Sequence, residues 1–295
     1  MGIIKDSLTF DDVSLIPQHS SIVPNETLTS VELSKNLKLK IPLIASAMDT
    51  VTESKMALAI GKIGGIGVIH RNLSTEKQIQ EVKKVKKQNL LVGAAIGVSD
   101  NDLNRAKKLI KANVDLLVID TAHGHTNKVF KIIKKIKKVI KRVPLCAGNI
   151  ATGKAAKFLA DSGVDIVKVG IGPGSICTTR LVAGVGVPQL SAVIEVKNAL
   201  RNRKTKIISD GGIKFSGDLA KAIGAGADAI MIGSLFSGTL ESPGKIFKRK
   251  GKLYKSFRGM GSAGAMAVGS SDRYYQKKFK DLSKFVPEGV EGIVK

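Results

Sequence analysis

The sequence predicts an α/β protein folded as a single (β/α)8 TIM barrel, and three observations support this fold class. Short apolar runs alternate with amphipathic segments along most of the 295-residue chain. Aromatic residues make up only 4% of the composition, which leaves the core to Ile, Val, Leu and Ala, as in buried parallel strands. Polar residues recur where the apolar runs end. Eight βα units need about 250 residues, so we expect one domain over residues 1–295.

Eight apolar runs are the candidate strands. They cover residues 43–48, 65–70, 90–98, 116–122, 143–150, 166–172, 206–212 and 229–234. Segments with helical periodicity separate them, at residues 52–63, 75–87, 101–112, 126–141, 152–162, 189–202 and 215–225. Because no break divides these alternations into two halves, they favour a closed barrel over an open doubly wound sheet.

Polar residues follow the candidate strands at their C-terminal ends. They are Asp49, His70, Asp120, Asn149, residues 172–177, Asp210 and Ser234. In a barrel these ends share one face, and active sites are built there. The sequence therefore predicts one site that draws residues from many strands.

The pattern changes after Ser234. Residues 235–292 are rich in Gly, Ser and Lys, and no eighth amphipathic helix precedes Lys295. Long segments of this kind in compact domains are usually lids or disordered. We therefore expect a mobile flap after the eighth strand.

The net charge of +24 permits two interpretations, nucleic-acid binding or basic outer helices. Within residues 131–141 the Lys residues alternate with Ile and Val at helical spacing, which predicts a solvated basic face. No interleaved aromatic residues offer stacking surfaces for bases. We favour basic outer helices, with attraction of anionic ligands such as nucleotides as the milder consequence.

Cysteine content and the N-terminus bear on the cellular compartment. Cys146 and Cys177 are the only cysteines and form no disulfide framework. The opening residues lack the features of a signal peptide, and no apolar run reaches membrane-spanning length. We expect a cytoplasmic protein without membrane contact.

Two kinds of glycine-bearing segment carry the candidate chemistry. The segments DGGI (Asp210–Ile213) and MIGS (Met231–Ser234) end the seventh and eighth strands, where barrels often bind phosphate through backbone N–H groups. The run GIGPGSIC does not match the dinucleotide fingerprint G-x-G-x-x-G, because Ser175 follows Gly172-Pro173-Gly174. Its Cys177 lies among flexible polar residues at the barrel mouth and is a candidate nucleophile, whereas Cys146 lies in an apolar strand.

Other polar residues have weaker signals. His123 and His125 could suggest a metal pair, but no third ligand has suitable spacing. Asp120 and Thr121 are better placed to bind a ribose hydroxyl or an amide. The pair Arg273-Tyr274, read from chemistry alone, is an anion contact on the flap.

Together, the motifs LTFDDVSLIP, SAMDTVTE, DTAHGH, GIGPGSICTTR, SDGGI, FRGMGSAGAM, SSDRYY and VPEGVEG resemble the IMP dehydrogenase family along essentially the whole chain. The resemblance implies NAD-dependent oxidation of IMP to XMP in guanine nucleotide biosynthesis. In it, Cys177 attacks C2 of the purine and the covalent intermediate is then hydrolysed. Arg273 and Tyr274 resemble the dyad that activates water, with Thr179 and Glu288 as a second proton route.

The resemblance also assigns binding residues. Those implied for the substrate are Ser46, Met48, Ser175, Asp210, Gly212, Gly233, Ser234, Gly259, Gly261 and Glu288. Those implied for NAD are Asp120, Thr121, Ala122, His123, Asn149, Gly170 and Gly172. The backbone carbonyls of Gly172, Gly174 and Cys177 resemble a monovalent-cation site, normally occupied by K⁺. A homotetramer is implied as well.

Two alternatives to this activity stay open. GMP reductase shares the barrel and the cysteine but uses NADPH and lacks the Arg-Tyr flap, so SSDRYY favours the dehydrogenase. A catalytically inactive basic scaffold that binds nucleotides or nucleic acid is the other alternative.

Three departures from the family pattern stand out. Residues 83–98 are continuous at the point where the family usually has inserted regulatory CBS modules. Phe257 stands where the family commonly has a Tyr. The chain also stops at Lys295, before a closing helix and a cation-site segment.

Overall fold

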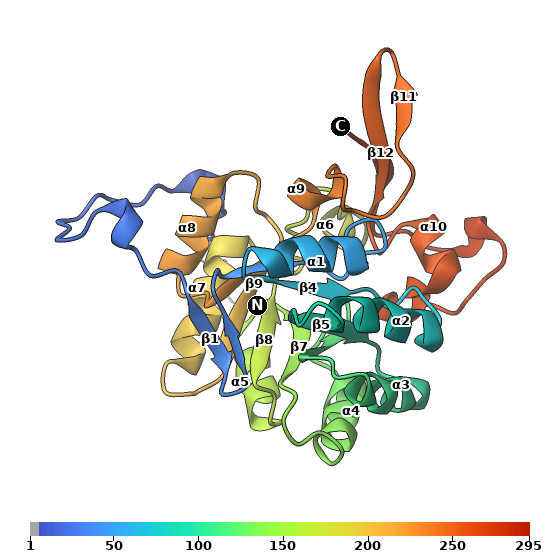
Figure 1. Ribbon diagram of the computed structural model, residues 1–295, viewed down its shortest axis with the longest axis horizontal. Helices are drawn as coiled ribbons and strands as arrows, with labels where there is room; N and C mark the ends of the chain where they lie inside the picture. Colours follow the sequence, from blue (N-terminus) through green and yellow to red (C-terminus); the bar gives the residue numbers. More distant parts are fainter. Residues whose placement is uncertain (1–5) are drawn as a thin grey trace.

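The computed structural model describes residues 6–295 and contains a closed barrel of eight parallel strands (Figure 1). The strands follow one another in chain order, and the eighth pairs with the first, with Ile230 opposite Leu43. They are β3 (Leu43–Ala45), β4 (Ile66–Ile69), β5 (Val92–Ile96), β6 (Leu116–Asp120), β7 (Leu145–Ile150), β8 (Ile166–Val169), β9 (Lys206–Asp210) and β10 (Ala229–Ile232). Each lies inside its predicted run, so the predicted barrel is confirmed.

The strands are apolar throughout because both of their faces are covered. Every residue of β5, β6 and β7 is buried. Inside the barrel, residues such as Val118 and Ile208 pack in one cluster with Leu33, Leu37 and Leu39. These leucines belong to an N-terminal hairpin of β1 (Val31–Ser34) and β2 (Leu37–Leu39), which packs against the barrel interior.

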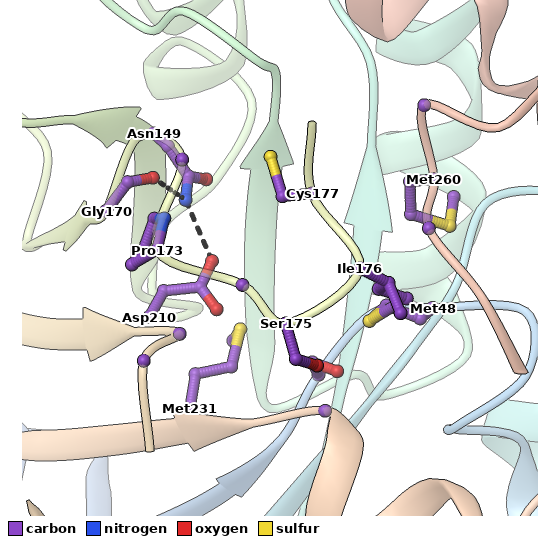
Figure 2. Close-up of a pocket in the computed structure, with 18 of the residues that line it drawn as sticks. Met48, Asn149, Gly170, Pro173, Ser175, Ile176, Cys177, Asp210, Met231 and Met260 are labelled. Carbon is purple, nitrogen blue, oxygen red and sulfur yellow. Dashed lines mark hydrogen bonds between the residues drawn. The ribbon is translucent and has the colours of Figure 1, made fainter. Parts of the chain in front are cut away.

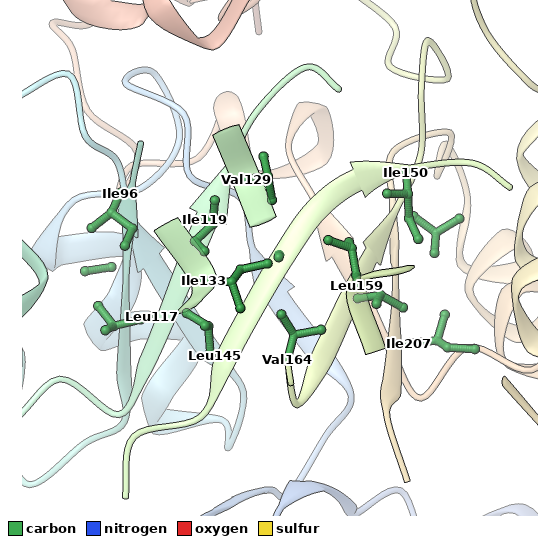
Figure 3. Packing of buried hydrophobic residues seen from close by; sticks show 14 of the residues in the cluster. Ile96, Leu117, Ile119, Val129, Ile133, Leu145, Ile150, Leu159, Val164 and Ile207 are labelled. Carbon is green, nitrogen blue, oxygen red and sulfur yellow. The ribbon is translucent and has the colours of Figure 1, made fainter. Parts of the chain in front are cut away.

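The outward-facing strand residues pack against the helices, and Figure 3 shows this for strand residues such as Ile119 and helix residues such as Ile133. The helices are α1 (Ser54–Lys62), α2 (Thr75–Lys86), α3 (Asp100–Lys111), α4 (Asn127–Lys137), α5 (Gly153–Asp161), α7 (Gln189–Leu200) and α8 (Ser216–Gly224). Ser74, Ser99, Thr126 and Thr152 cap four of them by accepting a backbone N–H of the first turn. One predicted end was wrong: α4 stops at Lys137 rather than at residue 141, and Ile140 turns into the core.

The chain after β10, for which the sequence predicts a long mobile flap, contains several regular elements. It contains α9 (Ser234–Ser237), β11 (Phe247–Arg249), β12 (Lys252–Arg258), α10 (Ala263–Ala265), η3 (Met266–Ser270), η4 (Ser271–Tyr274), η5 (Leu282–Lys284) and β13 (Glu291–Val294). Strands β11, β12 and β13 form an antiparallel sheet, and its β11–β12 hairpin projects away from the barrel (Figure 1).

Three short elements complete the described chain: η1 (Phe10–Asp12), η2 (Pro24–Glu26) and α6 (Thr179–Val182). Helix α2 passes to β5 through five residues, with no further domain between them. Among residues 6–295, no helix combines the length and apolar character that crossing a membrane requires.

Candidate active site

A cavity of about 190 Å³ lies at the C-terminal ends of the barrel strands, and Figure 2 shows Ser175, Cys177 and Asp210 around it. Most of the predicted site residues line it. They are Ser46, Met48, Asp120, Ala122, Asn149, Gly170, Gly172, Gly174, Ser175, Cys177, Thr179, Asp210, Gly212, Gly233, Ser234, Gly259, Gly261, Arg273, Tyr274 and Glu288. Thr121 and His123 are not among the lining residues. The structure therefore brings together residues from almost the entire length of the chain.

Sequence reasoning missed several residues of the cavity wall. Met231, Met260 and Ile213 supply apolar surface, and Lys168 supplies a buried charge. The apolar residues have no sequence signal that separates them from ordinary core. Lys168 does have one, because it is the single charged residue in the otherwise apolar strand β8.

The loop after β8 presents the Cys177 thiol to the cavity (Figure 2). The thiol donates a hydrogen bond to Thr179 Oγ1 at 3.2 Å, and the Cys177 amide donates to the Gly174 carbonyl at 3.1 Å. Gly172 has φ +81°, and a Cβ there would lie 2.7 Å from the Arg180 side chain. The turn therefore depends on glycine at this position.

Residues 288–290, which we call the C-terminal clamp, hold this loop from the other side. The Thr178 amide donates to the Glu288 carbonyl at 2.9 Å, and the Val290 amide donates to the Ile176 carbonyl at 3.0 Å. The Glu288 amide in turn donates to the Gly261 carbonyl at 2.9 Å. The nucleophile loop is thus tied to two segments that lie far along the chain.

A charged cluster forms the floor of the cavity on the side of β6 to β9. The Lys168 ammonium donates to Asp120 Oδ1 at 3.1 Å, to Asp210 Oδ2 at 2.7 Å and to Asn149 Oδ1. The Asn149 amide donates to Asp210 Oδ2 at 2.8 Å and to the Gly170 carbonyl at 2.7 Å (Figure 2). Each polar side chain in the cluster is therefore oriented by its neighbours.

The segment 273–275 covers the residues predicted to bind the cofactor. The Arg273 guanidinium forms an ion pair with the Asp120 carboxylate, and the Arg273 carbonyl accepts from the Ala122 amide at 3.1 Å. The Tyr275 hydroxyl lies 3.1 Å from the His123 carbonyl, to which it donates. In this structure the segment occupies the region beside Asp120.

Burial and neighbouring charges together fix the protonation states here. Burial by itself would raise the pKa of Asp120, but Arg273 and Lys168 outweigh it and hold that pKa well below its usual range. Burial would lower the pKa of Arg273, yet the Asp120 carboxylate raises it overall. Burial raises the pKa of Tyr274. Asp120 is therefore ionised, Arg273 charged and Tyr274 neutral near pH 7.

The opposite wall offers a small polar recess. Ser46 Oγ is buried and has no hydrogen-bond partner among residues 6–295. A Cβ on Gly233 would come within 3.0 Å of Met48 Sδ and 3.1 Å of Ser46 Oγ, so glycine keeps the recess open. Phe257, which replaces the tyrosine of the family pattern, lines the cavity without a hydroxyl to offer.

No metal centre is apparent in the described chain. The rings of His123 and His125 lie edge to face with centroids 6.3 Å apart. Across residues 6–295, no group of three or more His, Cys, Asp or Glu side chains could hold a metal ion.

This combination of barrel, thiol-bearing loop and charged cavity floor defines a class of barrel proteins with a ligand site at the strand ends. Residues 7–295 match the family described as IMP dehydrogenase / GMP reductase domain, and the chain belongs to that family. It is 47% identical to inosine-5'-monophosphate dehydrogenase of Borreliella burgdorferi, with 99% of this chain and 85% of that protein covered. The corresponding protein of Cryptosporidium parvum is 44% identical, with coverage of 99% and 83%.

A more distant relative is inosine-5'-monophosphate dehydrogenase of Rhizobium tropici, at 38% identity with coverage of 98% and 84%. That alignment extends over 416 positions, whereas this chain has 295 residues. The relative therefore carries inserted residues that have no counterpart here.

Proposed function

We propose that this protein is an NAD-dependent IMP dehydrogenase, which converts IMP to XMP for guanine nucleotide synthesis. The observation that carries the proposal is the Cys177 thiol at the cavity, opposite the cluster around Asp120, in a chain 47% identical to an enzyme of that name. The site therefore has a nucleophile, Cys177, on one side and an ionised carboxylate, Asp120, on the other.

The residues that we propose for IMP lie on the Cys177 side of the cavity. Ser175, Gly212 and Ser234 would hold the phosphate, because backbone N–H groups at these strand ends suit an anion. Asp210 would bind the ribose, since both described hydrogen bonds to its carboxylate go to Oδ2 and Oδ1 has no partner among residues 6–295. The recess at Ser46 and the apolar wall of Met231 and Met260 would accept the remaining atoms.

Cys177 would then act as the covalent nucleophile. The thiol loses its proton to solvent, its sulfur forms a bond to C2 of the purine, and the hydrogen on C2 leaves with its electron pair. NAD, when bound, supplies the acceptor for that hydride. Water later adds to C2, the C–S bond breaks with its electrons returning to sulfur, and XMP is released. Splitting oxidation from hydrolysis is what the covalent intermediate achieves.

The residues around Asp120 fit the nicotinamide end of NAD. The Asp120 carboxylate is ionised and buried, Asn149 is oriented by hydrogen bonds, and Gly170 has no side chain to block the approach. Because Arg273 lies against Asp120, the segment 273–275 has to withdraw before the cofactor occupies this region. We propose that this movement is the function of the flap, residues 235–292.

Once the cofactor leaves, the return of the flap would place Arg273 and Tyr274 beside Thr179 and Glu288 for the hydrolysis. The ion pair with Asp120 raises the pKa of Arg273, so the guanidinium keeps its proton in the described geometry. A role as general base therefore requires that Arg273 part from Asp120. Glu288 and Thr179 offer the second route for the proton.

The K⁺ site and the oligomer are the finer parts of the proposal. The carbonyls of Gly172, Gly174 and Cys177 suit a hard cation, but such ions usually take six or more oxygens. The Gly174 carbonyl also accepts the Cys177 amide, so further oxygens are needed. We propose that a neighbouring subunit of a homotetramer in the cytoplasm contributes to this site. Mass measurement with and without KCl tests this.

The activity is tested by mixing the protein with IMP, NAD and KCl and following NADH absorbance. We expect NADH to form, and Cys177→Ala to abolish turnover in a folded protein. NADPH oxidation on addition of GMP would establish a reductase instead. Salt-sensitive binding to single strands without any nucleotide-dependent redox change would favour a basic scaffold.

A further inference from the structure

Lys168 is a fully buried ammonium in the floor of the cavity. Its side chain is 2% exposed, and it points from β8 toward the pocket. Lysine has three N–H donors, and all three are used: they bond Asp120 on β6, Asn149 on β7 and Asp210 on β9. A single charged group thus joins four neighbouring strands at the level of the site.

Stability alone does not account for a lysine at this position. Removing an ammonium from water is unfavourable, and a well-packed apolar side chain of similar volume often stabilises a protein core as well or better. The neighbouring barrel interior is apolar, with Cys146, Ile166 and Ile208 in one cluster. The cost of burying Lys168 therefore points to a role in the site.

The two carboxylates that Lys168 joins face different halves of the cavity. Asp120 lies beside Arg273, Ala122 and Asn149, on the side proposed for the cofactor. Asp210 is followed by Gly211 and Gly212, on the side proposed for the nucleotide sugar and phosphate. With the flap in place, Arg273 and Lys168 balance the two carboxylates. When Arg273 withdraws, Lys168 still bonds both carboxylates directly, whereas Arg71 acts on Asp120 only through its charge.

We propose that Lys168 is a positioning residue that couples the two ligand subsites, holding Asp120 toward the cofactor and Asp210 toward the substrate. The proposal rests on the function proposed above for this site. Without the ammonium, two buried carboxylates repel each other, and they either separate or take up a proton. Either change moves or neutralises the carboxylates that accept hydrogen bonds from the cofactor and from the substrate, so both subsites are altered together.

The central test compares Lys168→Met, which keeps most of the volume, with Lys168→Arg, which keeps the charge. We expect Lys168→Met to raise KM for IMP and KM for NAD together, each by about tenfold or more, with a smaller fall in kcat. Lys168→Arg should recover part of both losses. Lys206→Met is the matched control, because Lys206 lies at the start of β9, pairs with Asp228 and does not line the cavity.

A double variant separates charge coupling from packing. In Lys168→Met/Asp120→Asn one carboxylate and one cation are removed together, so KM for IMP should return toward the wild-type value while KM for NAD stays high. Additive effects of the two substitutions would overturn the coupling. A Lys168→Met enzyme that raises only one KM, or neither, would also overturn it.

A second measurement applies if Lys168→Met does not fold. Calorimetric titration of IMP into Asp120→Asn, without cofactor, should show affinity changed by about threefold or more, although Asp120 lies on the cofactor side. Unchanged affinity would refute the proposal. A wild-type protein that produces no NADH would instead refute the proposed function, so the two failures are distinguishable.

Discussion

The two cysteines show how position in the barrel decides the chemistry of one residue type. Cys146 is fully buried in the apolar interior, where burial raises the pKa of its thiol to about 12. Cys177 is partly exposed at the cavity and bonds Thr179. Because only thiolates are good nucleophiles, Cys146 is inert at neutral pH.

Alkylation distinguishes the two thiols directly. With iodoacetamide at pH 8, we expect peptide mass spectrometry to find the adduct on Cys177 and not on Cys146, and IMP to slow the reaction. Labelling in urea provides the control, since both thiols become accessible there. Equal labelling of both in the folded protein would contradict the difference in environment.

Arg273 gives a second prediction at the level of one residue. Arg273→Ala should leave the first burst of NADH intact and slow the steady state strongly, because the residue is proposed for hydrolysis and not for hydride transfer. Rapid mixing of enzyme, IMP and NAD measures the two phases separately. An equal loss in burst and steady state would show that Arg273 serves the first step instead.

Most site residues could be predicted at this scale because they follow barrel strands or lie in motifs. Asp120, Asn149 and Asp210 were recognised in this way. Lys168 was missed although it is the single charged residue of an apolar strand, because its three bonding partners come together only in the fold. The Thr121 hydroxyl donates to the Gly148 carbonyl at 2.8 Å and Thr121 does not line the cavity, so its expected contact with the cofactor stays a prediction.

Among the elements, the barrel strands and helices were predictable and the segment after β10 was not. The difference is physical, because βα units have local periodicity, whereas β12 and β13 are paired by contacts between distant residues such as Lys255 and Val294. Strand β12 is also mostly exposed near its start, so it lacks the apolar run that marks β5 or β6.

The junction between β8 and β9 gives a prediction for two elements together. Gly170 has φ +151°, and a Cβ there would lie 2.0 Å from the Asp210 carbonyl oxygen. Gly170→Ala should therefore push β9 and Asp210 away and cost about 1–3 kcal/mol of stability or more, with loss of IMP binding.

Gly217→Ala is the matched control for that substitution. Gly217 lies in α8, and a Cβ there would meet nothing within 4 Å. We expect this variant to keep its activity and to unfold at the same or a slightly higher temperature, because Ala favours helix over Gly by about 1 kcal/mol. Thermal unfolding and IMP titration of both variants check the pair, and an undisturbed Gly170→Ala would contradict the described packing.

For the whole molecule, the buried charge cluster predicts how stability depends on pH. The folded state depresses the pKa of Asp120 below the ordinary 3.8, so the folded protein binds this proton more weakly than the unfolded chain does. The contribution of Asp120 is therefore present above that ordinary pKa and is lost as the pH falls below it.

Thermal unfolding between pH 6 and pH 3 measures this dependence. We expect Tm of the wild type to fall steeply toward pH 3 and the fall to be shallower in Asp120→Asn, because that side chain has no carboxylate to protonate. Parallel curves for the two proteins would show that other acids cause the acid unfolding.

The C-terminal clamp has a consequence for when the protein becomes active during its synthesis. The ribosome makes the loop around Cys177 long before it makes residues 288–290. Until then the Thr178 amide and the Ile176 carbonyl lack the hydrogen bonds that they form with this clamp. All eight barrel strands precede residues 288–290 in the chain, so a nascent chain that contains the complete barrel still lacks these two hydrogen bonds on its thiol loop. The order of translation therefore delays catalytic competence until almost the last described residues have been added.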